Sequence, residues 1–167
     1  MAGNKVRASD RRYRHVTAIQ DQLPNNHCYG CGADNPDGMQ IKSHWHGDET
    51  VCVYTPRPNQ CAGPKQYLYG GAIASLIDCH SVGTAISNYY RQEGREPGDG
   101  EEIWCVTGKL AVDYLAPTPI DRDVTLRATI EECTERKTVV RCRFYSGDTQ
   151  TAEGHVIAVR VPNSWRE

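Results

Sequence analysis

The stretch Tyr69-Gly70-Gly71-Ala72-Ile73-Ala74-Ser75-Leu76-Ile77-Asp78 predicts the start of a long helix that runs to about residue 91. At 100° per residue, Asp78 shares a stripe with Val82, Ala85 and Tyr89. The other sides are also apolar, and such a helix is normally wrapped by other structure. A carboxylate in that setting needs a partner, a raised pKa or a chemical role.

Two other features of this helix invite a functional interpretation. His80 lies about 200° from Asp78 around the axis, so the two cannot form a dyad, and we expect a core or interface histidine. Gly70 and Gly71 leave backbone N–H groups at the helix start, which suits an anion or a developing oxyanion. The glycines could equally serve a tight turn into the helix.

Length and charge limit the class of protein. The chain has 167 residues and a net charge of −2, which gives no reason to expect nucleic acid or a membrane surface as partner. No apolar run approaches the roughly 18 residues of a membrane helix, and the basic N-terminus lacks the apolar segment of a secretory signal. We expect a cytoplasmic protein with reduced thiols, although eight cysteines are present.

The remaining pattern predicts strands around the helix. An amphipathic surface helix is expected over 9–22, followed by a strand through Met39–Trp45 and another ending near Thr55. Four strands with period-two alternation follow the helix. In the first of them, one face is predicted to carry Trp104, Val106, Leu110, Val112 and Tyr114. Short links favour antiparallel pairing. The fold class is therefore α+β, with about six strands wrapped around one central helix.

We expect three parts in the chain. Residues 1–26 form an N-terminal tail and surface helix, residues 27–163 form a single domain, and residues 164–167 form a C-terminal tail.

Cys28 and Cys31 form a Cys-x-x-Cys pair with His27, His44 and His46 nearby. One such pair is half of a zinc ribbon, and a Cys₂His₂ site or a redox thiol pair are alternatives. A structural turn is the favoured interpretation. The other six cysteines are scattered singly, as buried thiols often are. No metal and no cofactor are predicted.

Several segments together resemble the hotdog-fold acyl-CoA thioesterases, and most closely the phenylacetyl-CoA thioesterase-like branch. The similarity spans about residues 27–160. It is carried by Cys28-Tyr29-Gly30-Cys31-Gly32, Asn35-Pro36-Asp37-Gly38-Met39, Gly70–Asp78, Val106-Thr107-Gly108-Lys109-Leu110 and Tyr114-Leu115-Ala116-Pro117-Thr118-Pro119.

The resemblance implies roles for individual residues. Asp78 would activate water or attack the thioester, and Gly70 or Gly71 would polarise the carbonyl. Thr107 would approach the acid. Substrate-binding roles would fall to Tyr69, which stands where the family usually has a histidine, and to Asn59 and Gln60, which are approximate counterparts of residues that hold water.

The resemblance also implies an activity and an assembly. The expected substrate is an acyl-CoA or aryl-CoA, hydrolysed to free acid and CoA at the interface of a homodimer, often paired into tetramers. Asp78 lies about 10 Å along the helix from Gly71, at ~1.5 Å per residue, so one site should draw them from different subunits. The alternatives are a non-catalytic acyl-CoA-binding protein, a zinc-stabilised module and a hydratase. The hydratase is disfavoured because Gly83, not histidine, lies five residues after Asp78.

Overall fold

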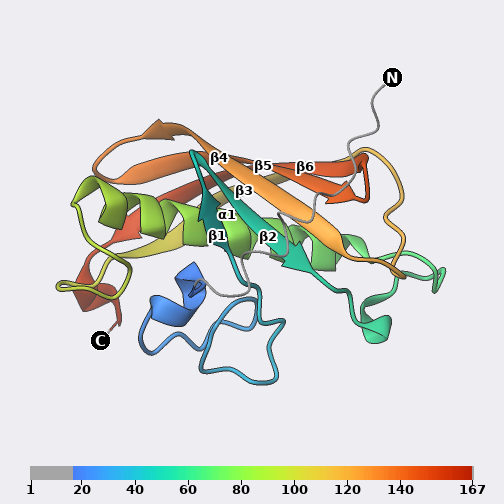
Figure 1. Ribbon diagram of the computed structural model, residues 1–167, viewed down its shortest axis with the longest axis horizontal. Coiled ribbons are helices and arrows are strands. Elements are labelled where there is room, and N and C mark those ends of the chain that lie inside the picture. The colour runs from blue at the N-terminus through green and yellow to red at the C-terminus, as the bar shows by residue number, and fades with distance from the viewer. Residues whose placement is uncertain (1–16, 167) are drawn as a thin grey trace.

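The computed structural model describes residues 17–166, and these form one antiparallel sheet wrapped around one long helix (Figure 1). The strands are β1 (His44–His46), β2 (Glu49–Tyr54), β3 (Trp104–Tyr114), β4 (Val124–Cys133), β5 (Lys137–Ser146) and β6 (Thr149–Val161). Their order is β1-β2-β4-β5-β6-β3, which leaves β3 at one edge. The α+β prediction is confirmed.

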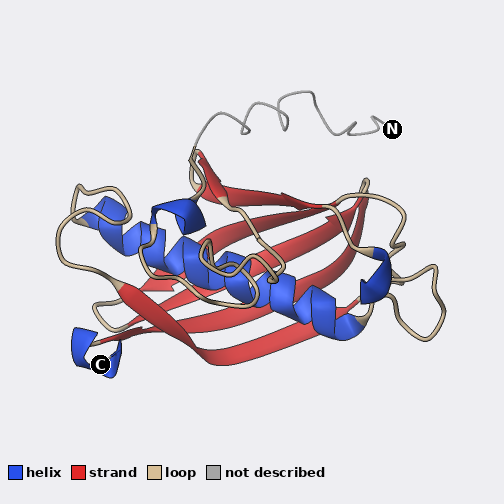
Figure 2. Ribbon diagram, turned by 90° about the horizontal axis from the view of Figure 1, so that it is seen from below, coloured by secondary structure: helices blue, strands red, loops and turns tan. Residues whose placement is uncertain are grey.

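The helix α1 (Gly70–Gln92) lies across the concave side of the sheet (Figure 2). Leu76 and Ile77 are fully buried, as the all-round apolar pattern predicts. A close approach to β6 is possible because residue 154 is glycine: a Cβ there would lie 2.2 Å from Ile77 Cγ2. None of the described helices is long and apolar enough to span a membrane.

The side of α1 away from the sheet is covered by a long loop over residues 23–43 (Figure 1). The predicted strand through Met39–Trp45 is wrong over most of its length, since only β1 forms there. Met39 and Ile41 are buried, yet their N–H groups bond within the loop, to the carbonyls of Tyr29 (2.7 Å) and Gly30 (3.0 Å). Gln40 between them has φ 58°, which interrupts an extended strand.

Of the helix predicted over 9–22, the described residues show only a short 3-10 helix, η2 (Ile19–Gln22). Residues 9–16 lie outside the described part of the chain. Ile19 and Gln20 are buried while Asp21 is exposed, so η2 is partly embedded and does not simply lie on the surface. The Gln20 side chain bonds to Ser43, and Gly83 of α1 gives it room, since a Cβ there would lie 2.7 Å from the Gln20 amide nitrogen.

The alternation predicted for β3 is wrong in its second half because the strand carries a bulge. Thr107 pairs with Ala158 and Lys109 with Ile157, so Gly108 is the extra residue. Leu110 then pairs with Val156, and Ala158 and Val156 are both fully buried. Directly opposed residues share a face, so Leu110 joins Thr107 on the helix side. Val112 and Tyr114 lie on the same face as Leu110, opposite the face of Trp104 and Val106.

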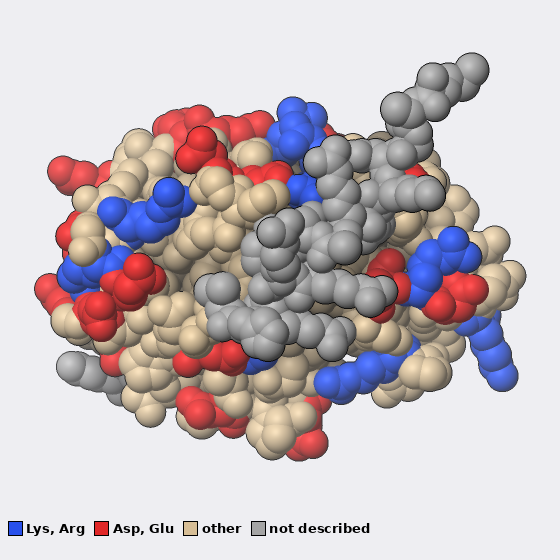
Figure 3. Space-filling view, viewed as in Figure 1, with Lys and Arg blue, Asp and Glu red and all other residues tan. Residues whose placement is uncertain are grey.

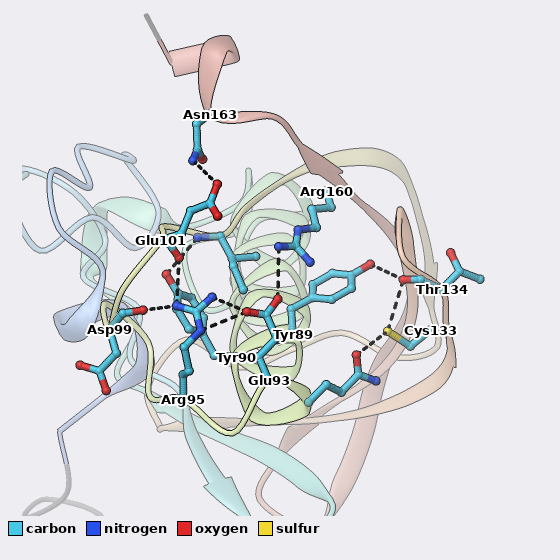
Figure 4. A network of polar contacts seen from close by, with 12 residues as sticks. Tyr89, Tyr90, Glu93, Arg95, Asp99, Glu101, Cys133, Thr134, Arg160 and Asn163 are labelled. Carbon is cyan, nitrogen blue, oxygen red and sulfur yellow. Dashed lines mark hydrogen bonds and ion pairs between the residues drawn. The ribbon is translucent and has the colours of Figure 1, made fainter.

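The C-terminal end of α1 is held by polar contacts with the loop that follows, with the β4–β5 connection and with β6 (Figure 4). Glu93 accepts hydrogen bonds from Arg95, with Nε at 3.0 Å, and from Arg160 at 3.3 Å. Tyr89 donates to the carbonyl of Thr134 at 2.8 Å.

Acidic and basic side chains are interspersed over the visible face of the molecule (Figure 3). No single charge sign dominates that face.

Candidate active site

Asp78 lies in the third turn of α1, half-buried, and accepts a hydrogen bond from Thr107 Oγ1 at 2.6 Å. Burial raises the pKa of Asp78, while the Thr107 hydrogen bond acts in the opposite direction. Negative charge on Cys28 adds a smaller upward contribution to the pKa. The carboxylate therefore has one firm donor and a proton affinity above that of an ordinary aspartate, which suits a general base.

The bulge in β3 lies next to this pair. Thr107 is the last residue before the register shift, and the extra residue is a glycine whose Cβ would lie 2.7 Å from Val159 Cγ2. A side chain at this position would collide with β6. Thr107 itself is exposed, so the Asp78–Thr107 pair is accessible from outside the chain.

The first turn of α1 carries free backbone donors. Tyr69 is the N-cap residue without a side-chain cap, and its carbonyl accepts the N–H groups of Ala72 (3.0 Å) and Ile73 (3.3 Å). Among the described residues, no acceptor meets the N–H groups of Gly70 and Gly71. These donors, at the positive end of the helix dipole, suit a carbonyl oxygen that gains negative charge.

Two tyrosines frame this helix start. The Tyr69 ring packs over Gly71, where a Cβ would lie 2.3 Å from Tyr69 Cε2. Tyr114 donates its hydroxyl hydrogen to the carbonyl of Gly70 at 2.7 Å. Sequence reasoning missed Tyr114, because alternation without the bulge placed its side chain on the other face. The Gly108 between alternating residues was the available signal for a bulge.

The loop before α1 brings Gln60 to the helix start. Its backbone carbonyl accepts the Tyr69 N–H at 3.0 Å. Its side-chain oxygen accepts from Tyr54 Oη (2.9 Å) and from the Arg57 N–H (2.8 Å), so it stabilises η3 (Pro58–Gln60). Asn59 is the exposed residue beside it.

Within one chain these residues form two separate groups. Asp78 and Thr107 make one, and Tyr69, Gly70, Gly71 and Gln60 make the other. Seven residues of helix separate Gly71 from Asp78, or about 10 Å at ~1.5 Å per residue. One small reacting group cannot contact both Gly71 and Asp78 of the same chain. Within one chain, the two groups therefore do not form a single site around one small reacting group.

His80 is a core histidine, as predicted. It is fully buried on the far side of α1 from Asp78, with Nδ1 2.8 Å from Ser43 Oγ and Nε2 3.2 Å from the Thr50 carbonyl. Burial lowers the pKa of His80 to about 4, so the ring is neutral at physiological pH.

The chain is similar to proteins of a known family. A family model described as the thioesterase superfamily matches residues 65–153, just over half of the chain. The chain is similar to a thioesterase superfamily protein from Shewanella loihica PV-4, with 36% sequence identity and a TM-score of 0.62. That similarity covers 83% of this chain and 96% of the other. No curated protein matches the chain.

Two further solved structures share the fold at low identity. A phenylacetic acid degradation-related protein from Ralstonia eutropha JMP134 is 14% identical, with a TM-score of 0.57, over 72% of this chain and 85% of that one. A thioesterase from Haemophilus influenzae is also 14% identical, with a TM-score of 0.60, over 74% and 79%. At this identity the likeness concerns the fold alone.

Proposed function

The chain belongs to the thioesterase superfamily and has the hotdog fold, and we propose that it hydrolyses an acyl-CoA or aryl-CoA to the free acid and CoA. The observation that carries the proposal is the half-buried Asp78 with its Thr107 donor. A carboxylate with a raised pKa beside a single hydroxyl is equipped to take a proton from water.

In the proposed reaction, Asp78 removes a proton from water as the water oxygen attacks the thioester carbonyl. The N–H groups of Gly70 and Gly71 bind the resulting oxyanion. When the carbonyl re-forms, the C–S bond breaks and the sulfur leaves as CoA thiolate, which takes up a proton. Water is the acceptor, and no step needs a metal or a cofactor. Direct attack by the carboxylate, with hydrolysis of the resulting anhydride, is the alternative use of Asp78.

We further propose that the site is shared between two chains of a homodimer. The strand β3 is a sheet edge of 11 residues. Large apolar side chains gather on and next to it with much of their surface exposed, as Leu110, Tyr114 and Leu115 do at 38%, 54% and 58%. A long apolar edge strand invites pairing with another chain. Pairing two β3 edges would let Gly70 and Gly71 of one chain serve Asp78 of the other.

The test is release of free thiol from a panel of short, long and aromatic CoA thioesters. Asp78→Ala should lower kcat/KM by roughly 10²–10⁴-fold, the usual contribution of a general base, and leave the dimer intact. Full activity in a folded, dimeric Asp78→Ala protein would refute the role of Asp78.

The second candidate is an acyl-CoA-binding protein without catalysis. It is favoured by one observation, the Tyr69 ring over Gly71, where the family usually has a histidine before the glycines. Calorimetry separates the two functions: binding of a CoA ester with no thiol released would support the second candidate. Turnover by wild type and loss of turnover in Asp78→Asn would support hydrolysis.

A further inference from the structure

Three cysteine side chains from distant parts of the chain meet beside α1. Cys28 and Cys31 come from the 23–43 loop and Cys79 from the helix. Their sulfur atoms all lie within 4.8 Å of one another, and the Cys28 and Cys79 sulfurs are 3.7 Å apart. All three are free thiols. Sequence reasoning treated Cys79 as one of the singly buried cysteines and missed this contact.

The spacing of the sulfurs fits a tetrahedral metal centre. Zinc binds thiolate sulfur at about 2.3 Å, which places two sulfurs of a tetrahedral site about 3.8 Å apart. The Cys28–Cys79 distance is close to that value. Shifts of about half an ångström per sulfur would bring the other pairs there, which side-chain rotation can supply.

The loop is built so that Cys79 can reach the Cys28–Cys31 pair. A Cβ at Gly30 would lie 2.3 Å from Cys79 Sγ, so any side chain there would displace the third sulfur. The backbone around the pair is also fixed, since the Gly32 N–H donates to the Cys28 carbonyl at 2.8 Å. Asn26 Oδ1 accepts the Cys28 N–H at 3.2 Å.

The three thiols also shift one another's pKa. The thiols of Cys31 and Cys79 lower the pKa of Cys28, and the backbone N–H groups of Cys31 and Gly30 contribute in the same direction. The same sharing with Cys28 raises the pKa of Cys31 and Cys79. Thiolate is the form of cysteine that binds metal.

We propose that Cys28, Cys31 and Cys79 form a metal site for Zn²⁺, with a fourth coordination position open to solvent. Thiolates select zinc and softer ions over Mg²⁺ and Ca²⁺. Cys28 is exposed whereas Cys79 is buried, so the open position lies on the Cys28 side, where water can bind. Within residues 17–166, no histidine or carboxylate joins this group, so His27, His44 and His46 are not its ligands.

A bound ion would fasten the 23–43 loop to α1 one residue from Asp78. This part of the loop contains no regular strand or helix, and the ion would supply a cross-link that its hydrogen bonds alone do not. A bound ion would run against our expectation that no metal is present, and the proposal assigns it no step in hydrolysis.

The site is tested by metal binding to tag-free protein. Protein purified without added metal should carry close to one zinc per chain by elemental analysis. The metal-free protein should take up Co²⁺ with thiolate-to-cobalt charge-transfer bands and tetrahedral d–d bands. Cys28→Ser and Cys79→Ala should each weaken zinc binding by more than about 100-fold, since even outer-shell changes cost 10–100-fold. Cys61→Ser, a half-buried cysteine outside the cluster, should bind like wild type.

Three results of the binding experiments would overturn the site. They are the absence of a cobalt–thiolate spectrum in reduced wild-type protein, zinc binding by Cys28→Ser that equals wild type, and loss of binding in Cys61→Ser. Because Cys28 is exposed, its serine variant is expected to fold, and it decides the question if Cys79→Ala does not. A Cys28–Cys79 disulfide in freshly purified protein would also exclude a resident metal.

Discussion

A charged carboxylate that is half-buried in a helix lowers the stability of the fold, and Asp78 is such a group. Its folded-state pKa lies above the ordinary value. The protonated carboxyl therefore favours the folded state relative to the charged one. This stabilisation is fully present below about pH 4, near the pKa of the unfolded chain, and is lost as pH rises through the folded pKa. Asp78→Asn should lower thiol release by the same roughly 10²–10⁴-fold as Asp78→Ala and raise the Tm at pH 7. Calorimetry against Asp99→Asn, an exposed carboxylate, checks this, and a lower Tm for Asp78→Asn would contradict it.

Thr107 is proposed to act through Asp78, by orienting the carboxylate. Thr107→Val removes the 2.6 Å hydrogen bond and keeps the side-chain shape. We expect kcat to fall about 10-fold, the worth of one hydrogen bond of ~1.4 kcal/mol, with KM unchanged. Thr107→Ser keeps the hydroxyl and should restore kcat. Equal activity of the valine and serine variants would exclude an orienting role.

His80 makes the fold sensitive to acid. Its pKa is about 4 in the folded protein, whereas an exposed histidine of the unfolded chain titrates near 6.5, so the unfolded chain binds more protons between these values. Stability should fall by about 3 kcal/mol as pH drops from 6.5 to 4, at ~1.36 kcal/mol per pH unit. Denaturant titrations at several pH values, with a chelator present, measure this. His80→Asn should flatten the dependence, and an unchanged slope would rule out His80 as its source.

Local rules predicted these helix residues well, and failed where distant segments meet. Rotation by 100° per residue separated Asp78 from His80 correctly, because both belong to one regular element. Cys79 and Cys28 are 51 residues apart in the sequence. Their contact depends on the tertiary fold, which local periodicity does not predict.

At the scale of elements, α1 and β6 pack in direct contact, with no room for an added side chain at Gly154. Gly154 of β6 faces Ile77 so closely that Gly154→Ala should lower stability by about 1–3 kcal/mol through overpacking. For a chain of this size, that is a fall in Tm of roughly 2–12 °C. Thermal unfolding measures it beside Gly63→Ala, where a Cβ would meet nothing within 4 Å. An unchanged Tm for Gly154→Ala would mean that α1 can move away.

The strands β4, β5 and β6 were predictable because their alternation continues with few interruptions. In β3 the single extra residue Gly108 reverses the face of all that follow. The loop before β1 was mistaken for a strand because Met39 and Ile41 alternate with polar residues while packing on α1 through a turn.

For the whole molecule, the proposed dimer gives a test that links assembly to activity. Leu110→Glu places a charge on the helix side of the β3 edge, where the leucine is 38% exposed. We expect monomers by light scattering and a parallel loss of thiol release. Val53→Glu, on β2 and 44% exposed, should keep both assembly and activity. An active Leu110→Glu monomer would show that one chain holds a complete site.

The strand order also determines how long β3 waits for its partner strand during synthesis of the chain. Among the described strands, β3 pairs only with β6, and Tyr114 and Thr149 lie about 35 residues apart. At ~5–20 residues per second, β6 leaves the ribosome about 2–7 s after β3. During that delay both edges of β3 are unpaired templates beside other nascent chains. Slower translation after residue 114 would lengthen this window and favour aggregation.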